Sequence, residues 1–176
     1  TSVAAFHGYN YLLARENLTD HLEEKNKQGK IRQRLLKIRA KKVILATGAL
    51  ERPLIFNNND RPGIMLSSAV KKYADFYGVV SGKKNIFFTN NDSAYESAFC
   101  LHNKGIKVEA IIDIRESSNS KIVKAVEEAG IKIYWSSTIV DTTGYKRLNS
   151  VSVMKLSNDG LSVTGNKMNI SCDCLG

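Results

Sequence analysis

The sequence predicts an α/β fold in which a parallel βαβαβ unit is flanked by antiparallel meanders. Three short apolar runs, Ile86–Phe88, Val108–Ile114 and Ile131–Trp135, alternate with segments of helical spacing, and the connections between them are short. Strands that alternate with helices in this way form a parallel sheet with crossover connections. On either side of this unit, short apolar runs separated by turn residues indicate strands that pair antiparallel.

Two helices are expected between the three parallel strands, at Ser93–Asn103 and Asn119–Ala129, and each is followed closely by a glycine. A glycine just beyond a helix permits the left-handed conformation that ends it. Ser118 or Asn119 is expected to cap the second helix. An earlier helix is expected over Ser67–Tyr77, where apolar residues recur at helical spacing before Gly78.

Antiparallel strands are expected on both sides of the parallel unit. Those before it are Val3–Phe6, Tyr11–Ala14 and Ile31–Ile38. The compact apolar run Val43–Ala46 follows them and is typical of a buried parallel strand. The runs after the parallel unit are Ile139–Val140, Val151–Leu156, Leu161–Val163 and Met168–Cys172, with Gly165-Asn166 among the turns between them.

The prolines mark a domain boundary. Pro53 and Pro62 are the two prolines of the chain, and they bracket the polar run Asn57–Asp60. We therefore expect a first domain over residues 1–56 that contains the meander and the strand at Val43–Ala46, and a second domain over residues 57–176. The chain does not begin with Met, which leads us to expect that it is an internal piece of a longer protein.

Composition excludes several classes of protein. The 176 residues are 43% hydrophobic and 24% charged, and no run approaches the roughly 20 apolar residues of a membrane span. The net charge of +9 comes from residues 25–42, which hold nine basic residues and no acidic one. We interpret this run as a solvated strand and turn; a phosphate-binding or subunit-docking surface is the alternative. Nucleic-acid binding is ranked last because no aromatic residues are interleaved for base stacking.

Cysteine and histidine usage predicts neither a metal site nor a catalytic one. The three cysteines are odd in number and sparse, which argues against a disulfide framework and suits a reducing cytoplasm. Cys172 and Cys174 would share one face of a strand, and small apolar packing is the favoured interpretation. The three histidines are scattered in sequence, and we assign no catalytic residue.

The loop after the strand Ile86–Phe88 is the first candidate site. In a dinucleotide fold this loop holds phosphate at a helix N-terminus. The usual glycines would fall at Thr89, Asn91 and Ala94, and none is present. One interpretation is a modified site that binds a single phosphate through side-chain amides and hydroxyls. The other is a vestigial loop in which Asp92 or Ser93 only caps the helix.

Two further features are weaker signals. Asp113 lies near the end of the next strand, where an acid would meet a ribose 2′-hydroxyl, and Arg115 follows it. The run Val43–Ala46 ends at Thr47-Gly48, where Thr47 can hydrogen-bond and Gly48 allows a turn with positive φ. A cofactor could lie against such a strand end, although a plain buried strand followed by a turn explains it as well.

Five segments of the chain together form a specific pattern: Thr19–Leu22, Ala46–Ala49, Glu51–Pro53, Asn59–Leu66 and Thr89–Tyr95. This pattern resembles the α subunit of heterotetrameric sarcosine oxidase, within the flavoproteins that have two dinucleotide-binding domains. The glycine-poor loop supports the assignment, because that branch has such a loop. The resemblance implies a Rossmann-like fold of the FAD/NAD(P)-binding type, with the second domain inserted into the first.

The resemblance also implies cofactors and partners. In the family the α subunit binds NAD, FMN lies at the interface with the β subunit, and the β subunit carries FAD. The complex oxidises sarcosine, reduces oxygen to hydrogen peroxide and transfers the one-carbon unit to tetrahydrofolate. Carried over by position, Ala46, Thr47 and Gly48 would lie near NAD. The candidates for the FMN side are Thr89, Asn90, Asn91, Asp92 and Ser93.

Rival functions remain open. One rival is the α subunit of a related amine or proline dehydrogenase complex, which passes electrons to a carrier instead of oxygen. Nothing in these 176 residues decides between the two, because the substrate site belongs to the partner subunit. A noncatalytic interaction domain with a decayed nucleotide loop is the rival from another class. The family's glycine-rich N-terminal fingerprint and its folate-binding half are not found in these residues, so we expect no oxidase activity from this chain alone.

Overall fold

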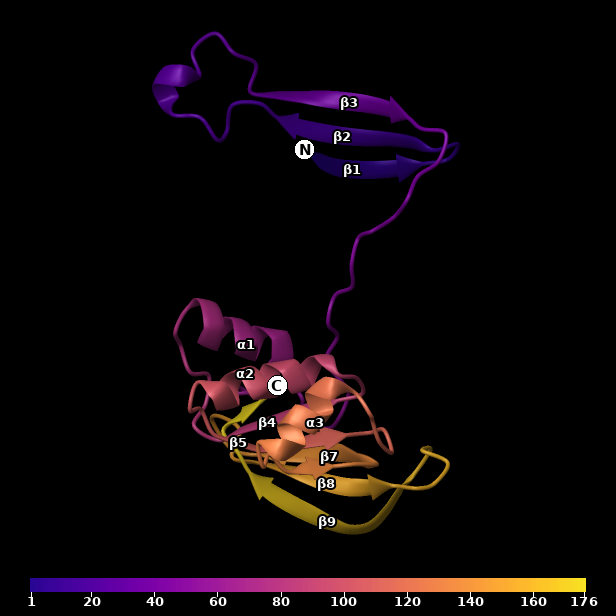
Figure 1. Ribbon diagram of the computed structural model, residues 1–176, viewed down its shortest axis with the longest axis vertical. Helices are drawn as coiled ribbons and strands as arrows, with labels where there is room; N and C mark the ends of the chain where they lie inside the picture. The colour runs from indigo at the N-terminus through magenta and orange to yellow at the C-terminus, as the bar shows by residue number, and fades with distance from the viewer. The chain divides into compact units, whose positions relative to one another are not determined.

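The computed structural model describes all residues from 1 to 176, and they form two compact units (Figure 1). The first unit comprises Thr1–Ala49 and the second Leu50–Gly176. This division by contacts lies a few residues before the domain boundary expected between residues 56 and 57, which itself stays a prediction.

The first unit is a three-stranded antiparallel meander. Strands β1 (Ser2–His7), β2 (Tyr11–Asn17) and β3 (Gln33–Arg39) lie in the order β1-β2-β3. A short 3-10 helix, η1 (Glu24–Asn26), lies in the long β2–β3 connection. The predicted meander is confirmed. Most side chains of β3 are exposed, as expected for a basic, solvated strand.

The prediction of a buried strand at Val43–Ala46 is wrong. These residues belong to no strand, and the side chains of Ile44 and Leu45 are 91% and 69% exposed. A strand requires a neighbour to satisfy its backbone N–H and C=O groups. The sheet of this unit contains β1, β2 and β3 and no strand that pairs with Val43–Ala46. An apolar run is therefore not sufficient to form a strand.

The second unit contains the predicted parallel sheet. Its strands lie in the order β10-β4-β5-β6, and every pair is parallel. Their bounds are Asn85–Thr89 (β4), Val108–Asp113 (β5), Ile133–Tyr134 (β6) and Cys174–Leu175 (β10). The crossover helices α2 (Ser93–Asn103) and α3 (Lys121–Glu128) connect β4 to β5 and β5 to β6. The expected βαβαβ unit is thus confirmed.

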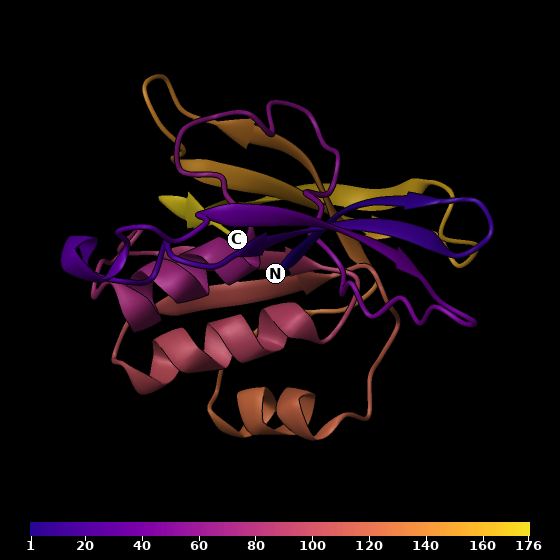
Figure 2. The ribbon, with the colours of Figure 1, turned by 90° about the horizontal axis from the view of Figure 1, so that it is seen from above.

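The parallel sheet is covered differently on its two faces (Figures 1 and 2). Helix α1 (Ser67–Phe76), α2 and α3 cover one face, and a core cluster joins them to Phe87 and Ile111 of the sheet. An antiparallel sheet of β7 (Ser137–Thr143), β8 (Ser150–Leu156) and β9 (Val163–Ser171) covers the other face. Apolar residues on both faces explain why β4 and β5 are continuous apolar runs.

The last meander has one strand fewer than the sequence suggested. The runs Leu161–Val163 and Met168–Cys172 were expected to be separated by a turn at Gly165-Asn166, but this pair lies inside β9. Gly165 has a φ of 75°, and the β8–β9 register shifts between Val153 and Lys155. A bulge absorbs the left-handed glycine, so the strand continues through it.

The two neighbouring cysteines do not share one face, contrary to expectation. Cys172 packs in the core between the two sheets, whereas Cys174 packs in the core under the helices. The chain bends at Asp173 between β9 and β10, which breaks strand alternation. Burial raises the pKa of each thiol to about 12, so both are neutral and behave as small apolar residues, as predicted.

The cap of α3 also differs from the two candidates. Ser120 occupies the N-cap position, and its hydroxyl accepts a hydrogen bond from the Val123 amide at 3.4 Å. Ser118 instead donates to Asp92, across the loop. Gly130 follows the helix with a φ of 76°, as expected for its end. None of the helices has the length and apolarity that a membrane span requires.

Shortening a leucine in the helix-side core should destabilise the second unit. Leu101 of α2 is 1% exposed and lies in the helix-side cluster. We expect Leu101→Ala to lower the free energy of unfolding by about 2–5 kcal/mol, because it leaves a cavity. Leu161→Ala is the matched control, since Leu161 is 88% exposed, and should stay within about 0.5 kcal/mol. Urea denaturation of both variants measures the difference; equal effects would contradict this core.

Candidate functional site

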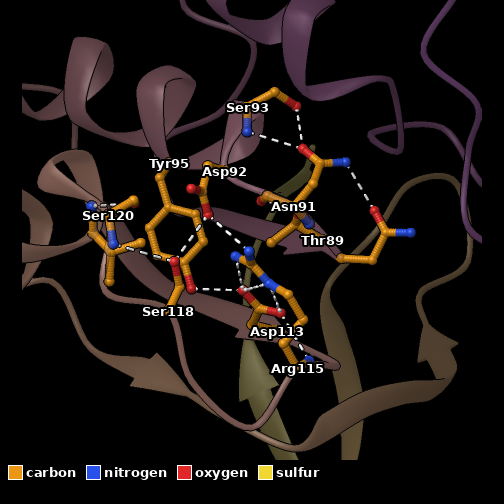
Figure 3. Close-up of polar contacts among 11 residues, drawn as sticks. Thr89, Asn91, Asp92, Ser93, Tyr95, Asp113, Arg115, Ser118 and Ser120 are labelled. Carbon is orange, nitrogen blue, oxygen red and sulfur yellow. Dashed lines mark hydrogen bonds and ion pairs between the residues drawn. The ribbon is translucent and has the colours of Figure 1, made fainter.

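Side chains, not glycines, shape the loop between β4 and α2 (Figure 3). The Thr89 hydroxyl donates to the Asn91 carbonyl at 2.8 Å and accepts from the Asn91 amide at 3.1 Å. The Asn91 side-chain oxygen accepts from the Ser93 amide at 2.9 Å and from its hydroxyl at 2.6 Å. Thr89 and Asn91 thus form two consecutive side-chain turns. These bonds hold the loop closed without the usual glycines.

Asp92 does not cap α2, contrary to one of the two expectations. It occupies the N-cap position, but its φ of −82° and ψ of −12° are helical, and its side chain makes no capping bond. Its Oδ1 instead lies 2.8 Å from Nη1 of Arg115 and accepts from the Ser118 hydroxyl at 3.3 Å. Burial raises the pKa of Asp92, but Arg115 and the nearby serines outweigh this and hold it below its usual value.

Asp113, at the end of β5, is fully buried, and both of its carboxylate oxygens accept hydrogen bonds (Figure 3). The Tyr95 hydroxyl donates to its Oδ2 at 2.8 Å, and Nη2 of Arg115 donates to the same oxygen at 2.7 Å. Its Oδ1 accepts from the Arg115 amide at 2.9 Å and from Nε at 3.1 Å. The hydrogen bonds to Asp113 raise the pKa of Arg115, which therefore stays charged.

Tyr95 joins this polar cluster to the helix-side core. Its side chain is fully buried, and its ring stacks on Trp135 with a centroid separation of 6.1 Å. Burial, followed by the bond to Asp113, raises the pKa of Tyr95, so its hydroxyl remains a proton donor. The guanidinium of Arg115 lies 5.8 Å from the ring centroid. Hydrogen bonds, ion pairs and ring stacking thus connect Asp92, Tyr95, Asp113 and Arg115 to one another and to the core.

A pocket of about 530 Å³ lies within the second unit, on the side of the β4–α2 loop that faces away from Arg115. Its volume is in the range that holds a small-molecule ligand. It is lined by two segments and Ser67: Leu50–Ile55 from one side, and Phe88–Asn91 with Ser93 and Ala94 from the other. Asp92 is not among the lining residues, because its side chain turns toward Arg115. The exposed polar side chains that the β4–α2 loop contributes to the pocket are those of Asn90, Asn91 and Ser93.

Glu51 and Arg52 give the pocket one fixed and one free charge. The Glu51 carboxylate accepts from the Ser67 and Ser68 amides, each at 3.0 Å, at the N-terminus of α1. Burial raises the pKa of Glu51, but the bonds from the two serines outweigh it and hold the pKa below its usual value. Arg52 is exposed, lines the pocket and makes no ion pair. Its guanidinium is available to an anionic ligand.

The other expected cofactor residues, Ala46, Thr47 and Gly48, belong to the first unit. All three are exposed and lie in the irregular segment after β3. Gly48 has a φ of 71°, as its predicted turn requires. The structure describes no group of three or more histidine, cysteine or acidic side chains that could hold a metal ion.

Sequence reasoning missed Arg52 and Tyr95 and gave Arg115 no role. Arg52 lies within a resembling segment, so a free cation beside the loop could have been noted from the sequence. Tyr95 is two residues into α2, where it reads as an ordinary core aromatic. Its bond to Asp113 spans 18 residues of sequence, and no local pattern reveals such a contact.

The sequence is similar to sarcosine oxidase α subunits. It is 41% identical over 161 residues to the one from Corynebacterium sp. strain P-1, which covers 90% of this chain and 16% of that protein. It is 38% identical over 122 residues to the one from Rhizobium meliloti strain 1021, and that match covers 69% of this chain and 12% of that protein. The resemblance inferred from the motifs is confirmed. The chain spans less than a fifth of the length of these relatives, and no family model matches it.

Solved structures confirm the fold class. Thioredoxin reductase from T. acidophilum aligns with a TM-score of 0.56 at 15% identity, over 81% of this chain and 46% of that one. A ferredoxin reductase from Rhodopseudomonas palustris aligns with a TM-score of 0.53 at 17% identity, over 80% and 34%. A FAD-dependent pyridine nucleotide-disulphide oxidoreductase from Desulfovibrio vulgaris aligns with a TM-score of 0.52 at 12% identity, over 81% of this chain and 36% of that one. The fold is that of FAD/NAD(P)-binding oxidoreductases.

Removing the Tyr95 hydroxyl should weaken the buried cluster. Tyr95→Phe keeps the ring stacked on Trp135 but deprives Asp113 of one of its donors. We expect a loss of about 1–2 kcal/mol in the free energy of unfolding. Tyr145→Phe is the matched control, because Tyr145 is 93% exposed. A Tyr95→Phe variant as stable as the control in urea denaturation would contradict the buried bond.

The Glu51 contact should make stability depend on pH. A depressed pKa in the folded state stabilises the fold above the unfolded-state pKa, and this contribution disappears as pH falls through the folded-state pKa. We expect Glu51→Gln to be less stable than wild type at pH 7, with the difference shrinking below about pH 4.5. Denaturant unfolding at several pH values tests this. Glu116→Gln, an exposed glutamate without an ion pair, controls for the loss of charge; a similar profile would refute the Glu51 contact.

Proposed function

We propose, from the premise that this chain is a relative of sarcosine oxidase α subunits, that it contributes a flavin phosphate site to a sarcosine oxidase-like complex. The observation that carries the proposal is the pocket at the head of α2, with the free cation of Arg52 on its rim. In this view the residues from Thr89 to Ser93 are the binding loop, and FMN is the cofactor it receives.

The donors at the pocket suit one phosphate group. The positive end of the α2 dipole favours an anion at this position. The Ser93 amide is already bonded to Asn91, so side chains would supply most of the contacts. The Asn90 side-chain oxygen accepts from Nδ2 of Asn91 at 2.8 Å, whereas Nδ2 of Asn90 makes no bond within the protein and can donate to a phosphate. Arg52 can bind two phosphate oxygens at once. The fit is to a monophosphate bound by side chains.

The redox chemistry belongs to the bound cofactors and to partner subunits. FMN would supply the chemistry of electron transfer to oxygen, and hydrogen peroxide would be the product. The β subunit would carry FAD and oxidise sarcosine, and a folate-binding region of the α subunit would receive the one-carbon unit. The residues of this chain would bind and orient FMN at the interface with the β subunit, in a cytoplasmic heterotetramer. On its own the chain would be inactive as an oxidase.

NAD would bind at a separate place. Ala46, Thr47 and Gly48 are proposed to lie near NAD in the complete first domain. All three are exposed in this chain, which is consistent with a segment that other parts of a subunit would cover. A related amine or proline dehydrogenase complex would use the same arrangement with another electron acceptor.

One observation favours a different class of function. The loop from Thr89 to Ser93 satisfies many of its own donors, as a decayed nucleotide loop would. A noncatalytic interaction domain is therefore the second candidate. It predicts a complex whose FMN content is unaffected by any change at the pocket.

Replacing Arg52 should weaken FMN binding in the complete complex. We expect Arg52→Ala to raise the dissociation constant for FMN about tenfold, because one charge-assisted pair to phosphate is lost. Reconstitution of the flavin-free complex with FMN, followed by flavin fluorescence, measures this constant. Arg39→Ala is the matched control, since Arg39 is exposed on β3 in the first unit.

Asn91→Ala gives an independent test of the loop. This change removes the acceptor for Ser93 and should reduce the FMN content of the purified complex. An unchanged FMN content in both the Arg52 and Asn91 variants would rule out this site and leave the noncatalytic function.

A further inference from the structure

We propose that Arg115, held between Asp92 and Asp113, blocks the end of β5 where the adenosine of an adenine nucleotide would bind. This domain therefore rejects NAD, NADP and AMP, and its pocket stays open to a flavin mononucleotide. The proposal rests on the proposed function of the pocket, which it narrows to one class of ligand. It identifies Arg115 as a specificity-determining residue.

Binding of an adenine dinucleotide in this fold requires a free acidic side chain at the end of the second strand of the βαβ unit. An acidic side chain there accepts hydrogen bonds from the ribose hydroxyls, so at least one of its oxygens must face the ligand. Asp113 is the residue at this position. It ends β5 and pairs with Thr89 at the end of the neighbouring strand β4. Its position therefore suits ribose.

The contacts of Asp113 leave no oxygen for a ribose. Its side chain is 0% exposed, and both oxygens accept bonds from groups of this chain. A carboxylate offers about four lone-pair sites. Tyr95 and Arg115 supply the donors, and the guanidinium lies where it covers the carboxylate. A ribose could reach Asp113 only if Arg115 moved away from both of its acidic partners.

The charge of the cluster opposes phosphate as well. Two carboxylates and one guanidinium sum to one negative charge, and Asp92 lies at the head of α2, where a pyrophosphate would bind. The net negative charge of the cluster also repels the 2′-phosphate of NADP, although an arginine at this position could otherwise bind that phosphate. Nε, Nη1 and Nη2 of Arg115 all already donate to carboxylates.

The loop therefore has two sides with different properties (Figure 3). On one side Asn90, Asn91 and Ser93 line the pocket with Arg52, and Asp92 does not. On the other side Asp92 turns toward Arg115, and the cluster is closed. Flavin mononucleotide has one phosphate and no adenosine, so it can use the first side alone. A dinucleotide needs both.

Trp135 provides a direct probe of the closed side. It is the single tryptophan of the chain and stacks on Tyr95, whose hydroxyl bonds to Asp113. A nucleoside that displaced Arg115 would change the surroundings of this stacked pair. Titration of the chain with NAD, NADP and AMP, followed by Trp135 fluorescence, therefore reports on the adenosine side. A parallel titration with FMN, followed by flavin fluorescence, reports on the pocket.

The test compares wild type with variants that open the cluster. Wild type should show no saturable response to the three adenine nucleotides at millimolar concentration. The double variant Asp92→Asn with Arg115→Gln removes the ion pair as a neutral unit and should bind AMP and NAD at least tenfold more tightly. Asp20→Asn with Arg32→Gln removes an exposed ion pair of the first unit and should behave as wild type. Circular dichroism checks that each variant is folded.

Two results would overturn the proposal. One is a saturable change in the Trp135 fluorescence of wild type with NAD or NADP; the other is a folded double variant whose Trp135 fluorescence responds no better than that of wild type. If the double variant fails to fold, the Arg115→Lys variant tests the proposal instead. The single ammonium of lysine cannot bind both acids, so this variant should show a smaller gain in AMP binding. No gain in AMP binding would refute the proposal. Loss of FMN binding with adenine nucleotides still excluded would count against the proposed function alone.

Discussion

The parallel pairing of β4 with β5 is the constraint on which the candidate site depends. It sets Thr89 opposite Asp113, so the loop that opens α2 and the acid that ends β5 lie at one edge of the sheet. Buried side chains on both faces hold the two strands, with Phe87 and Ile111 toward the helices and Ile86 and Ile112 toward the second sheet. A displacement of either strand would separate Asp92 from Arg115. The chemistry of the loop is thus fixed by packing beneath it.

That edge is arranged so that the protein satisfies its own polar groups. The β5 side is filled by charge-assisted bonds among Asp92, Arg115 and Asp113. The α1 terminus is occupied by Glu51, which stands where an external anion could bind. Buried charges require such partners, because an unpaired one is costly. Of the charged groups around the pocket, Arg52 is the one left without a partner, which is why the proposed ligand site lies beside it.

Elements formed by strong local signals were predicted closely. Helix α2 has the bounds that its apolar spacing and the following glycine predicted, and β4 and β5 agree within one or two residues. The failures share a cause. Val43–Ala46 has the composition of a strand but no neighbour to pair with, and the run through Gly165 continues because a bulge accepts the glycine. Pairing partners and register shifts arise from contacts distant in sequence, which composition does not encode.

The sequence by itself determined the α/β class, the order of the parallel unit and the loop that is poor in glycine, because periodicity and turn residues act over a few positions. The resemblance to sarcosine oxidase α subunits was likewise readable from short segments, and it holds over most of the chain. The tertiary structure decided the roles of the charged residues. Asp92 could have capped its helix, and Asp113 could have faced a ribose. Arg115 reaches both only in the folded chain, and the bonds it makes there dictate which side of the loop remains open.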